Sequence, residues 1–490
     1  MKKTNLILVA AAACAVTAFA ASCGKNKVKE KFEISISARS LLSEQNMLNL
    51  WKAEYEKTHP NTIVSVSGWG SNEGTSESYV LKNALNRGYL TNICYTTDDS
   101  TANLAMMKNF VDLRPFYEAD PETDYSKYYS SMLDTTSFYG EFRPTTKYTG
   151  SYECEKSDDS QYGVYFAPRE YNMPAILCNV TLMKDKLATD EEKANWGNES
   201  IRNLLIRVSG EGASAPWNWS TFVKALQNIS KVCETLNSAG DLGYRACEVN
   251  AHWEPIYTTI MKELGGDGLF KMDDRGEVSC NLDSTANKAA YSAIQSGFDK
   301  SVNKYMVDSD EGNDNFSTRN IFMAFVSYPE VGSYYEAFKK VNYELGAINI
   351  PCEYVGAGCG GYAIFVDKAN EVQKLKSGES AKTVDLCWDF IKYIISKEGQ
   401  NVAGKEGYIQ PVLKELADTG DWLQSYDGKI DNRAFETGKE LRLDTYCFAE
   451  PDIRNELRTA ISQFFRYLFG STGTDLNKTI SEVNTILAGN

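Results

Sequence analysis

Residues able to catalyse reactions are scarce in this 490-residue chain. Its two histidines, His59 in a THPN turn and His252, stand in unrelated contexts, which disfavours a Ser-His-Asp triad. The sequence has no HExxH, GxSxG or GxxxxGKS/T motif. Two carboxylates would suffice to hydrolyse a glycoside and leave no short motif, so a surface glycosidase remains the alternative. The sequence otherwise predicts a protein that is not an enzyme and needs no cofactor.

Cys23 is the residue whose context points most clearly to a covalent modification. Two lysines precede an apolar run from Leu6 to Ala21, shorter than the roughly 20 residues of a membrane-spanning helix. Small residues then lead to Cys23, as in the bacterial lipobox, although Ala20 stands where Leu is usual. We expect a signal peptide over residues 1–22 and a lipidated cysteine with a flexible tether over residues 23–32. Ordinary cleavage and free secretion are the alternative.

The other cysteines allow disulfides without requiring them. Cys14 would leave with the signal peptide, so ten of the twelve cysteines would remain beside the acylated one, an even number. Two candidate bridges are Cys352 with Cys359 and Cys233 with Cys247. Buried free thiols are equally compatible with these positions. Paired CxxC motifs are missing, and the sequence therefore predicts no metal site of the familiar zinc type.

The composition favours an uncharged ligand. Aromatic residues make up 12% of the chain, with 29 Tyr and 8 Trp, and flat rings stack well on the C–H patches of sugars. The formal net charge is −15 and becomes −17 once the signal peptide and its two lysines are removed. Such an acidic chain is not expected to bind nucleic acid.

Alternating strands and helices would position these side chains. Residues 32–39 and 61–69 have the pattern of strands and flank a helical stretch over residues 41–60, which is a βαβ unit. A helix over 77–88 and a strand over 91–99 follow. Ligands of such α/β folds bind beyond the carboxyl ends of the strands, which here are Arg39, Trp69 and the pair Asp98 and Asp99.

Further helices are expected over residues 219–235, 253–264 and 284–299, and the last third of the chain is helix-rich. Residues 140–162 and 197–215 lack a helical period and mix Gly, Ser and charged residues, so both are interpreted as surface insertions.

Seven segments in order carry a resemblance to a known family. They are LNLWKAEYEKTHPNTIVSV, NFVDLRPFYEAD, YGVYFAPREYNMPAILCN, PWNWSTFVKALQNISK, RNIFMAFVSYPEVGSYY, VGAGCGGYAIF and VDLCWDFIKYIISKEGQ. Over residues 33–487 the chain resembles the extracellular solute-binding lipoproteins of ATP-driven (ABC) importers, of the maltose-binding type. Asn92 replaces the family's usual Asp, and Tyr328 stands where the family often has Trp.

The resemblance implies an α/β, two-lobed, periplasmic-binding-protein-like (class II) fold with ligand in an interlobe cleft. Chain crossings would fall near residues 165–169, 323–325 and 360–363. The lobes would then be residues 33–166 with 325–360, and residues 167–324 with 361–490.

The function that the resemblance implies is capture of a solute, expected to be a sugar or oligosaccharide, and its delivery to the membrane permease subunits of an ABC importer. The protein would be a monomer, anchored through Cys23 to the extracytoplasmic face of the cell membrane.

Candidate ligand contacts lie at strand ends and crossings. Trp69 would stack on the ligand or pack in its loop, and Asp98 and Asp99 would bind hydroxyls or cap a helix. On the first crossing Glu170 is the first choice, with Tyr171 beside it. Trp253 would contact ligand or pack in the core.

Among Tyr328, Tyr334 and Tyr335, one tyrosine is expected to face the cleft and the others to pack. Tyr446 lies near another aromatic contact of the family. Four tryptophans on helical faces or at a helix start are expected in the core: Trp51, Trp217, Trp219 and Trp388.

Overall fold

A computed structural model describes most of the chain. The described residues are 28–69, 77–88, 90–97, 109–128, 137–139, 143–144, 146–147, 155–156, 162–197, 199–240, 243–251, 253–272, 278–298, 306–308, 316–436, 439–441 and 451–488.

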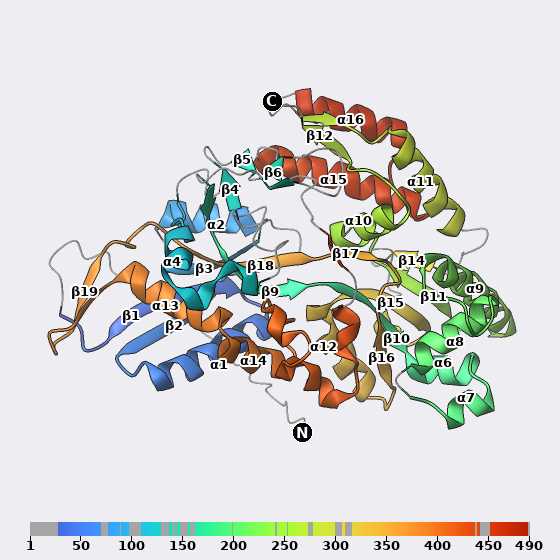
Figure 1. Ribbon diagram of the computed structural model, residues 1–490, viewed down its shortest axis with the longest axis horizontal. Coiled ribbons are helices and arrows are strands. Elements are labelled where there is room, and N and C mark those ends of the chain that lie inside the picture. Colours follow the sequence, from blue (N-terminus) through green and yellow to red (C-terminus); the bar gives the residue numbers. More distant parts are fainter. Residues whose placement is uncertain are drawn as a thin grey trace, which may run out of the picture.

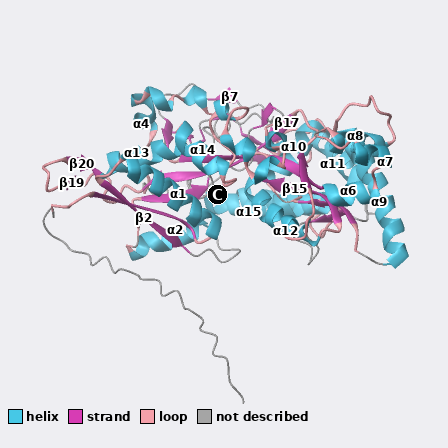
Figure 2. Ribbon diagram, turned by 90° about the horizontal axis from the view of Figure 1, so that it is seen from below, coloured by secondary structure: helices cyan, strands magenta, loops and turns pink. Residues whose placement is uncertain are grey.

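Two five-stranded sheets organise two lobes that lie side by side (Figure 1). The first sheet has the order β2-β1-β3-β18-β9, with β1 (Phe32–Arg39), β2 (Thr62–Trp69), β3 (Ile93–Thr97), β9 (Ala167–Asn172) and β18 (Gly358–Ile364). The second has the order β14-β11-β15-β10-β16, with β10 (Pro174–Asn179), β11 (Arg245–Val249), β14 (Met306–Asp308), β15 (Ile321–Ser327) and β16 (Leu345–Ile348). Helices flank the strands of both lobes (Figure 2).

The first sheet begins with the predicted βαβ unit. Strand β1 pairs in parallel with both β2 and β3, and α1 (Leu42–Thr58) connects the first two strands. Side chains alternate along a strand, so Ile34, Ile36 and Ala38 enter one core. The same core receives Trp51 of α1 and Trp388 of α13 (Thr383–Ile395).

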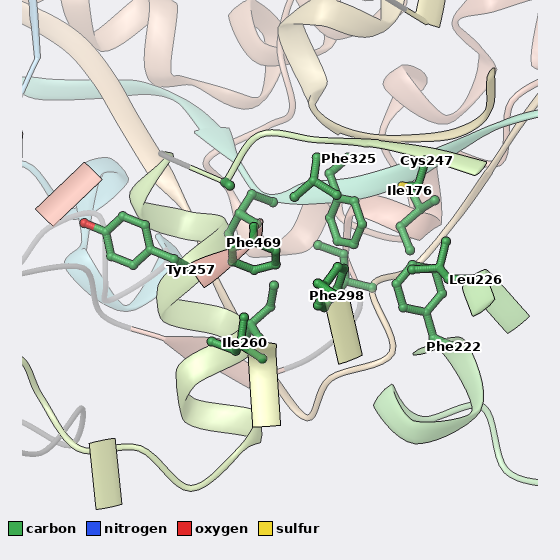
Figure 3. Packing of buried hydrophobic residues seen from close by; sticks show 14 of the residues in the cluster. Ile176, Phe222, Leu226, Cys247, Tyr257, Ile260, Phe298, Phe325 and Phe469 are labelled. Carbon is green, nitrogen blue, oxygen red and sulfur yellow. The ribbon is translucent and has the colours of Figure 1, made fainter. Parts of the chain in front are cut away.

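The second sheet is buried on both faces. Ile176 and Cys178 of β10 enter a core shared with helices on one face, whereas Ala175 and Leu177 enter a core on the other face. Figure 3 shows the first of these cores, where the rings of Phe222 and Phe325 lie 5.7 Å apart in an edge-to-face contact.

The remaining elements complete the two lobes. On the first lobe they are α2 (Glu77–Arg87), α4 (Arg114–Ala119), α14 (Lys397–Lys405), β19 (Val372–Lys374) and β20 (Ser380–Lys382). On the second they are α6 (Val180–Lys186), α7 (Asp190–Ala194), α8 (Ser200–Ser209), α9 (Trp219–Gly240), α10 (Glu254–Glu263), α11 (Thr285–Phe298), α12 (Tyr328–Lys339), α15 (Pro451–Leu468), α16 (Leu476–Ala488), β12 (Phe270–Met272) and β13 (Val278–Cys280).

Short strands and 3-10 turns lie between these larger elements. The strands are β4 (Ser137–Tyr139), β5 (Arg143–Pro144), β6 (Thr146–Lys147), β7 (Glu155–Lys156), β8 (Tyr162–Val164), β17 (Tyr354–Gly356) and β21 (Lys439–Leu441). The turns near the end of the chain are η4 (Lys414–Leu416), η5 (Asp421–Gln424), η6 (Tyr426–Gly428) and η7 (Asn432–Phe435).

Residues 197–215 were expected to be an irregular insertion, and that expectation is wrong. They contain α8, whose Ile201, Leu204 and Leu205 recur at helical spacing and are buried in the second lobe. The three predicted helices α9, α10 and α11 are confirmed, with ends that differ by up to five residues.

The course of the chain between the lobes differs from the sequence prediction. The chain leaves the first sheet at Asn172 and enters the second at Pro174, later than residues 165–169. The second crossing was expected near residues 323–325, within β15, and β16 was expected in the first lobe. Both strands instead pair with β10 in the second sheet. The chain returns through β18, after Ala357.

The region after residue 361 was assigned to the second lobe, and the structure divides it. Helices α13 and α14 pack on the first lobe because their apolar faces cover its sheet, and the chain contributes to this core as far as Leu416. From Trp422 onward the apolar side chains pack into the second lobe.

The cysteines of the described part of the chain include free thiols in the core. Cys233 and Cys247, one of the two candidate bridges, are separate, buried and unpaired with each other. Burial raises the pKa of both thiols, which makes them inert packing groups. Cys352 is also free, and the side chain of Cys359 lies outside the described residues.

Candidate functional site

The first sheet ends in a row of polar and aromatic residues. Arg39 of β1 pairs with Trp69 of β2, and Gly360 of β18 lies between Thr97 of β3 and Glu170 of β9. Strand β9 runs in the direction of β3, so all these positions lie at the edge where parallel strands end. This is the edge at which open α/β sheets bind ligands.

The two lobes meet at an interlobe junction made of Asn172, Gly358 and Trp253. Asn172 and Gly358 pair at the ends of β9 and β18 in the first lobe, whereas Trp253 precedes α10 of the second lobe. A Cβ atom on Gly358 would lie 3.7 Å from Cζ2 of Trp253 and 3.9 Å from Cβ of Asn172. Trp253 is half-buried and packs partly against the core of its own lobe. The predicted Trp253 thus lies beside the first crossing.

Four charged residues beneath this edge form a buried ion cluster of Arg39, Glu44, Arg169 and Glu170. Nη1 and Nη2 of Arg169 donate to the two oxygens of Glu44 at 2.5 and 2.7 Å. Nη2 of Arg169 also donates to Glu170 at 3.1 Å, and Arg39 donates to Glu44 at 2.5 Å. Two guanidinium groups therefore face two carboxylates, and the formal charges balance.

Aromatic rings enclose the ion cluster. The guanidinium carbon of Arg169 lies 4.2 Å from the ring centre of Tyr95, and that of Arg39 lies 4.9 Å from the same ring. Tyr362 accepts a hydrogen bond from Nη1 of Arg169 at 3.1 Å. These contacts hold Arg169, which is 1% exposed, in a single place.

A bulge in β9 explains why Arg169 points into this cluster. Gly360 pairs with Glu170 and Gly361 pairs with Pro168, so Arg169 is an extra residue between two pairs. Glycine is needed opposite the bulge, because a Cβ atom on Gly360 would overlap the hydroxyl of Tyr95 and one on Gly361 would overlap the carbonyl of Ala167. The VGAGCGGYAIF motif therefore encodes this local geometry.

The electrostatics of the cluster fix Glu44 as a carboxylate. Burial alone would raise its pKa, but the charges and hydrogen bonds of Arg169 and Arg39 more than offset burial and lower the pKa to about 2. Glu44 is therefore ionised throughout the physiological range.

Trp69 lies at this edge with an unsatisfied donor. Its ring is half-buried and packs against both cores of the first lobe. Its Nε1 is shielded from solvent and has no hydrogen-bond partner within the described part of the chain. An indole of this kind presents an apolar face and an N–H group to a polar ligand.

Two asparagines supply unsatisfied acceptors near Trp253. Oδ1 of Asn172 and Oδ1 of Asn250 are both shielded from solvent, and neither accepts a hydrogen bond from any described residue. Asn250 directly follows β11, and its backbone carbonyl accepts from the N–H of Trp253 at 3.2 Å. Asn250 was missed by the sequence analysis, although its position just after a strand was a usable signal.

Three of the predicted contacts have no surface free for a ligand. Glu170 is 2% exposed and belongs to the ion cluster, and Tyr171 is fully buried in the core of the first lobe. Tyr328 is fully buried beside Trp422, and its hydroxyl lies 3.1 Å from Oγ of Ser425. The placement of these side chains favours positioning and packing over the predicted ligand contacts.

The other predicted residues are buried, half-buried or undescribed. Tyr334 is half-buried with its ring against Phe316, whereas the hydroxyl of Tyr335 donates to Asp427 at 2.8 Å. Cys23, Asp98, Asp99 and Tyr446 lie outside the described residues. Burial confirms the packing prediction for Trp51, Trp219 and Trp388, and Trp217 packs half-buried against the second lobe.

The described residues bring together no group of His, Cys, Asp and Glu able to hold a metal ion. Within the same part of the chain, no helix combines the length and apolar character needed to cross a membrane.

Comparison with solved structures identifies similar folds at low identity. The GacH receptor of Streptomyces glaucescens, solved unliganded and with acarbose, is 15% identical, with a TM-score of 0.61 over 94% of this chain and 99% of that chain. MalE of Bdellovibrio bacteriovorus bound to maltotriose is 14% identical, with a TM-score of 0.58 over 93% and 99%. UgpB of Mycobacterium tuberculosis with glycerophosphocholine is 13% identical, with a TM-score of 0.61 over 94% and 98%.

Sequence comparison gives the family. No curated protein was found to match the chain. The family model described as bacterial extracellular solute-binding protein matches residues 41–401, which include the interlobe junction and all of the ion cluster except Arg39. The two-lobed α/β fold agrees with this match. The chain therefore belongs to the family of bacterial extracellular solute-binding proteins.

Proposed function

We propose that the protein is the receptor of an ATP-driven importer and captures a sugar or oligosaccharide between its two lobes. The observation that carries the proposal is the interlobe junction, where Trp253 of the second lobe lies beside Asn172 and Gly358 of the first. An aromatic face with amide groups around it suits a sugar, which offers flat C–H patches and a rim of hydroxyls.

The balanced charges of the ion cluster support an uncharged ligand. Arg39 and Arg169 are already paired with Glu44 and Glu170, so the ion cluster offers no surplus charge to an anion or cation. The acarbose and maltotriose complexes of GacH and MalE, which share this fold, agree with a carbohydrate ligand.

Both lobes would contribute ligand contacts. We assign this role to Trp69, Asn172, Trp253 and Asn250, whose unsatisfied atoms or half-buried rings lie at strand ends or beside the crossing. Asp98, Asp99, Tyr334 and Tyr446 are further candidates at the positions that the family resemblance indicates. A ligand that contacts both lobes favours the closed state by its differential affinity, and no covalent chemistry is needed.

Delivery requires the receptor to stay near its permease. We propose that a lipid on Cys23 anchors the protein to the extracytoplasmic face of the cell membrane and that the closed protein docks on the permease as a monomer. Two acyl chains give stable anchoring where one chain would exchange. Mass spectrometry of the mature N-terminus tests this step: a diacylglyceryl-modified Cys23 is expected, and an unmodified residue would contradict it.

A thermal-shift screen tests the binding function. The purified protein is heated with mono- and oligosaccharides, and glycerophosphocholine serves as a comparison ligand that is not a sugar. A ligand at about 100 times its Kd stabilises the folded state by about 2.7 kcal/mol, which gives a clear rise in Tm. Absence of any shift with sugars, together with measurable hydrolysis of a glycan, would contradict receptor function and favour the glycosidase alternative.

A further inference from the structure

We propose that Gln410 is a positioning residue for the ligand site: it fixes Asn172 at the first crossing and ties that crossing to the second lobe. The role of Asn172 as a ligand contact rests on the proposed function, whereas the link between the lobes does not.

Gln410 forms hydrogen bonds with the backbone on both sides of Asn172. Its backbone carbonyl accepts from the N–H of Tyr171 at 3.0 Å, and its side-chain Oε1 accepts from the N–H of Met173 at 3.0 Å. Because β9 is an edge strand of the first sheet, these outward N–H groups would otherwise lack partners in the sheet. One residue therefore sets the direction of the strand at the point where it leaves the first lobe.

The same side chain reaches the second lobe. Nε2 of Gln410 donates to the carbonyl of Phe435 at 2.8 Å and to Oε1 of Glu436 at 3.0 Å. Phe435 is fully buried in a core formed with β10 of the second sheet. Ile409 and Val412, which lie within two residues of Gln410 on the chain, are buried in the core of the first lobe. The amide of Gln410 thus bridges the two lobes.

The bridge lies at the crossing itself. Met173 is the single residue between β9 and β10, and Figure 1 shows β9 on the side of the first lobe that faces the second. Gln410 is fully buried, so loss of its amide leaves the N–H of Met173 and the carbonyl of Phe435 without these partners and shielded from water. We infer that this amide restricts the angle between the lobes and keeps Asn172 aligned with Trp253.

Gln400 provides a matched comparison. It is also fully buried, and its Nε2 donates to the carbonyl of Arg169 on the same edge of β9 at 3.0 Å. Its other side-chain bonds go to the carbonyl of Ile394 and the N–H of Val412, which belong to the first lobe. Gln400 therefore stabilises the same strand without joining the lobes.

The experiment compares Gln410→Met and Gln410→Glu with Gln400→Met in the full-length mature protein. Glutamate keeps the acceptor for Met173 but cannot donate to Phe435 when ionised and places a second carboxylate beside Glu436. Spin labels on unnatural amino acids at the exposed positions Lys57 and Lys231 report the distance between α1 of the first lobe and α9 of the second.

Both Gln410 variants are expected to widen the distance distribution of the ligand-free protein and to weaken sugar binding at least tenfold. Gln400→Met is expected to lower Tm but to keep the wild-type distances and an affinity within twofold. A wild-type distance distribution in both Gln410 variants, or equal widening in Gln400→Met, would overturn the proposal. The distance measurement needs no ligand, so it decides the role of Gln410 even if wild type binds no sugar, a result that would contradict only the proposed function.

Discussion

Glu44, near the start of α1, and Arg169, at the bulge of β9, form a bidentate ion pair with N–O distances of 2.5 and 2.7 Å, although they are 125 residues apart in the sequence. The pair joins the beginning of the first lobe to the strand that leaves it. Because Arg39 donates to the same carboxylate, the carboxyl end of β1 is fixed to the crossing strand. Binding would therefore depend on a charged support that the ligand itself need not touch.

Glu44→Gln is expected to destabilise the protein by about 3–5 kcal/mol, because it leaves buried Arg169 short of a charge partner. Urea unfolding followed by tryptophan fluorescence measures the loss. Glu54→Gln removes a more exposed partner of Lys57 on the same helix and should cost no more than about 1 kcal/mol. Equal stability of the two variants would contradict the structural role of the ion cluster.

Acid should remove the contribution of Glu44. Its folded-state pKa of about 2 lies below the ordinary value of 4.5, so its stabilisation is present above pH 4.5 and is lost as the pH falls towards 2. The difference in unfolding free energy between wild type and Glu44→Gln should therefore narrow over this range. If the unfolding free energies of wild type and Glu44→Gln differed by the same amount at pH 5 and at pH 2.5, the carboxylate of Glu44 would not be stabilised by the two arginines.

Gly360→Ala should cost about 1–3 kcal/mol, because the added methyl group overlaps the ring and hydroxyl of Tyr95. Chemical denaturation measures the cost, and the added change Tyr95→Phe should restore part of it by removing the hydroxyl. Gly197→Ala is the control, since a Cβ atom there meets nothing within 4 Å. If Gly360→Ala is as stable as Gly197→Ala, the packing inferred at the bulge is wrong.

Trp69→Ala is expected to abolish the rise in Tm that sugars cause, while the protein stays folded, because the ring is only half-buried. Trp196→Ala is the matched control: it is also half-buried but lies over Lys184 of the second lobe, at 5.0 Å from its ammonium group. The control should keep the wild-type shift. An unchanged shift in Trp69→Ala would mean that its indole packs in its loop and does not contact the ligand.

The sequence predicted local elements better than the partners of those elements. The βαβ unit of β1, α1 and β2 has clear periodicity, and it was found as predicted. Helix α13 has an equally clear apolar face, but periodicity does not say which sheet that face covers. The lobe boundaries depended on this choice and differ from the prediction.

The candidate site shows the same limit. Trp253 was predicted from the resemblance of its segment to a ligand-contacting segment of the maltose-binding type, and the structure puts it at the interlobe junction. Glu170 was chosen for its charge, but its partner Arg169 stands in a bulge that no spacing in β9 reveals. Gln410 carried no signal, because its contact with the first crossing joins segments more than 230 residues apart.

Titration calorimetry of the most stabilising sugar into wild type and Trp253→Ala tests the central claim most directly. The proposal predicts binding of one sugar per wild-type chain and an affinity at least tenfold weaker in Trp253→Ala, with both proteins folded by circular dichroism. Saturable binding of the same affinity in both proteins, or no sugar binding to wild type, would contradict capture of a carbohydrate at the junction of the two lobes.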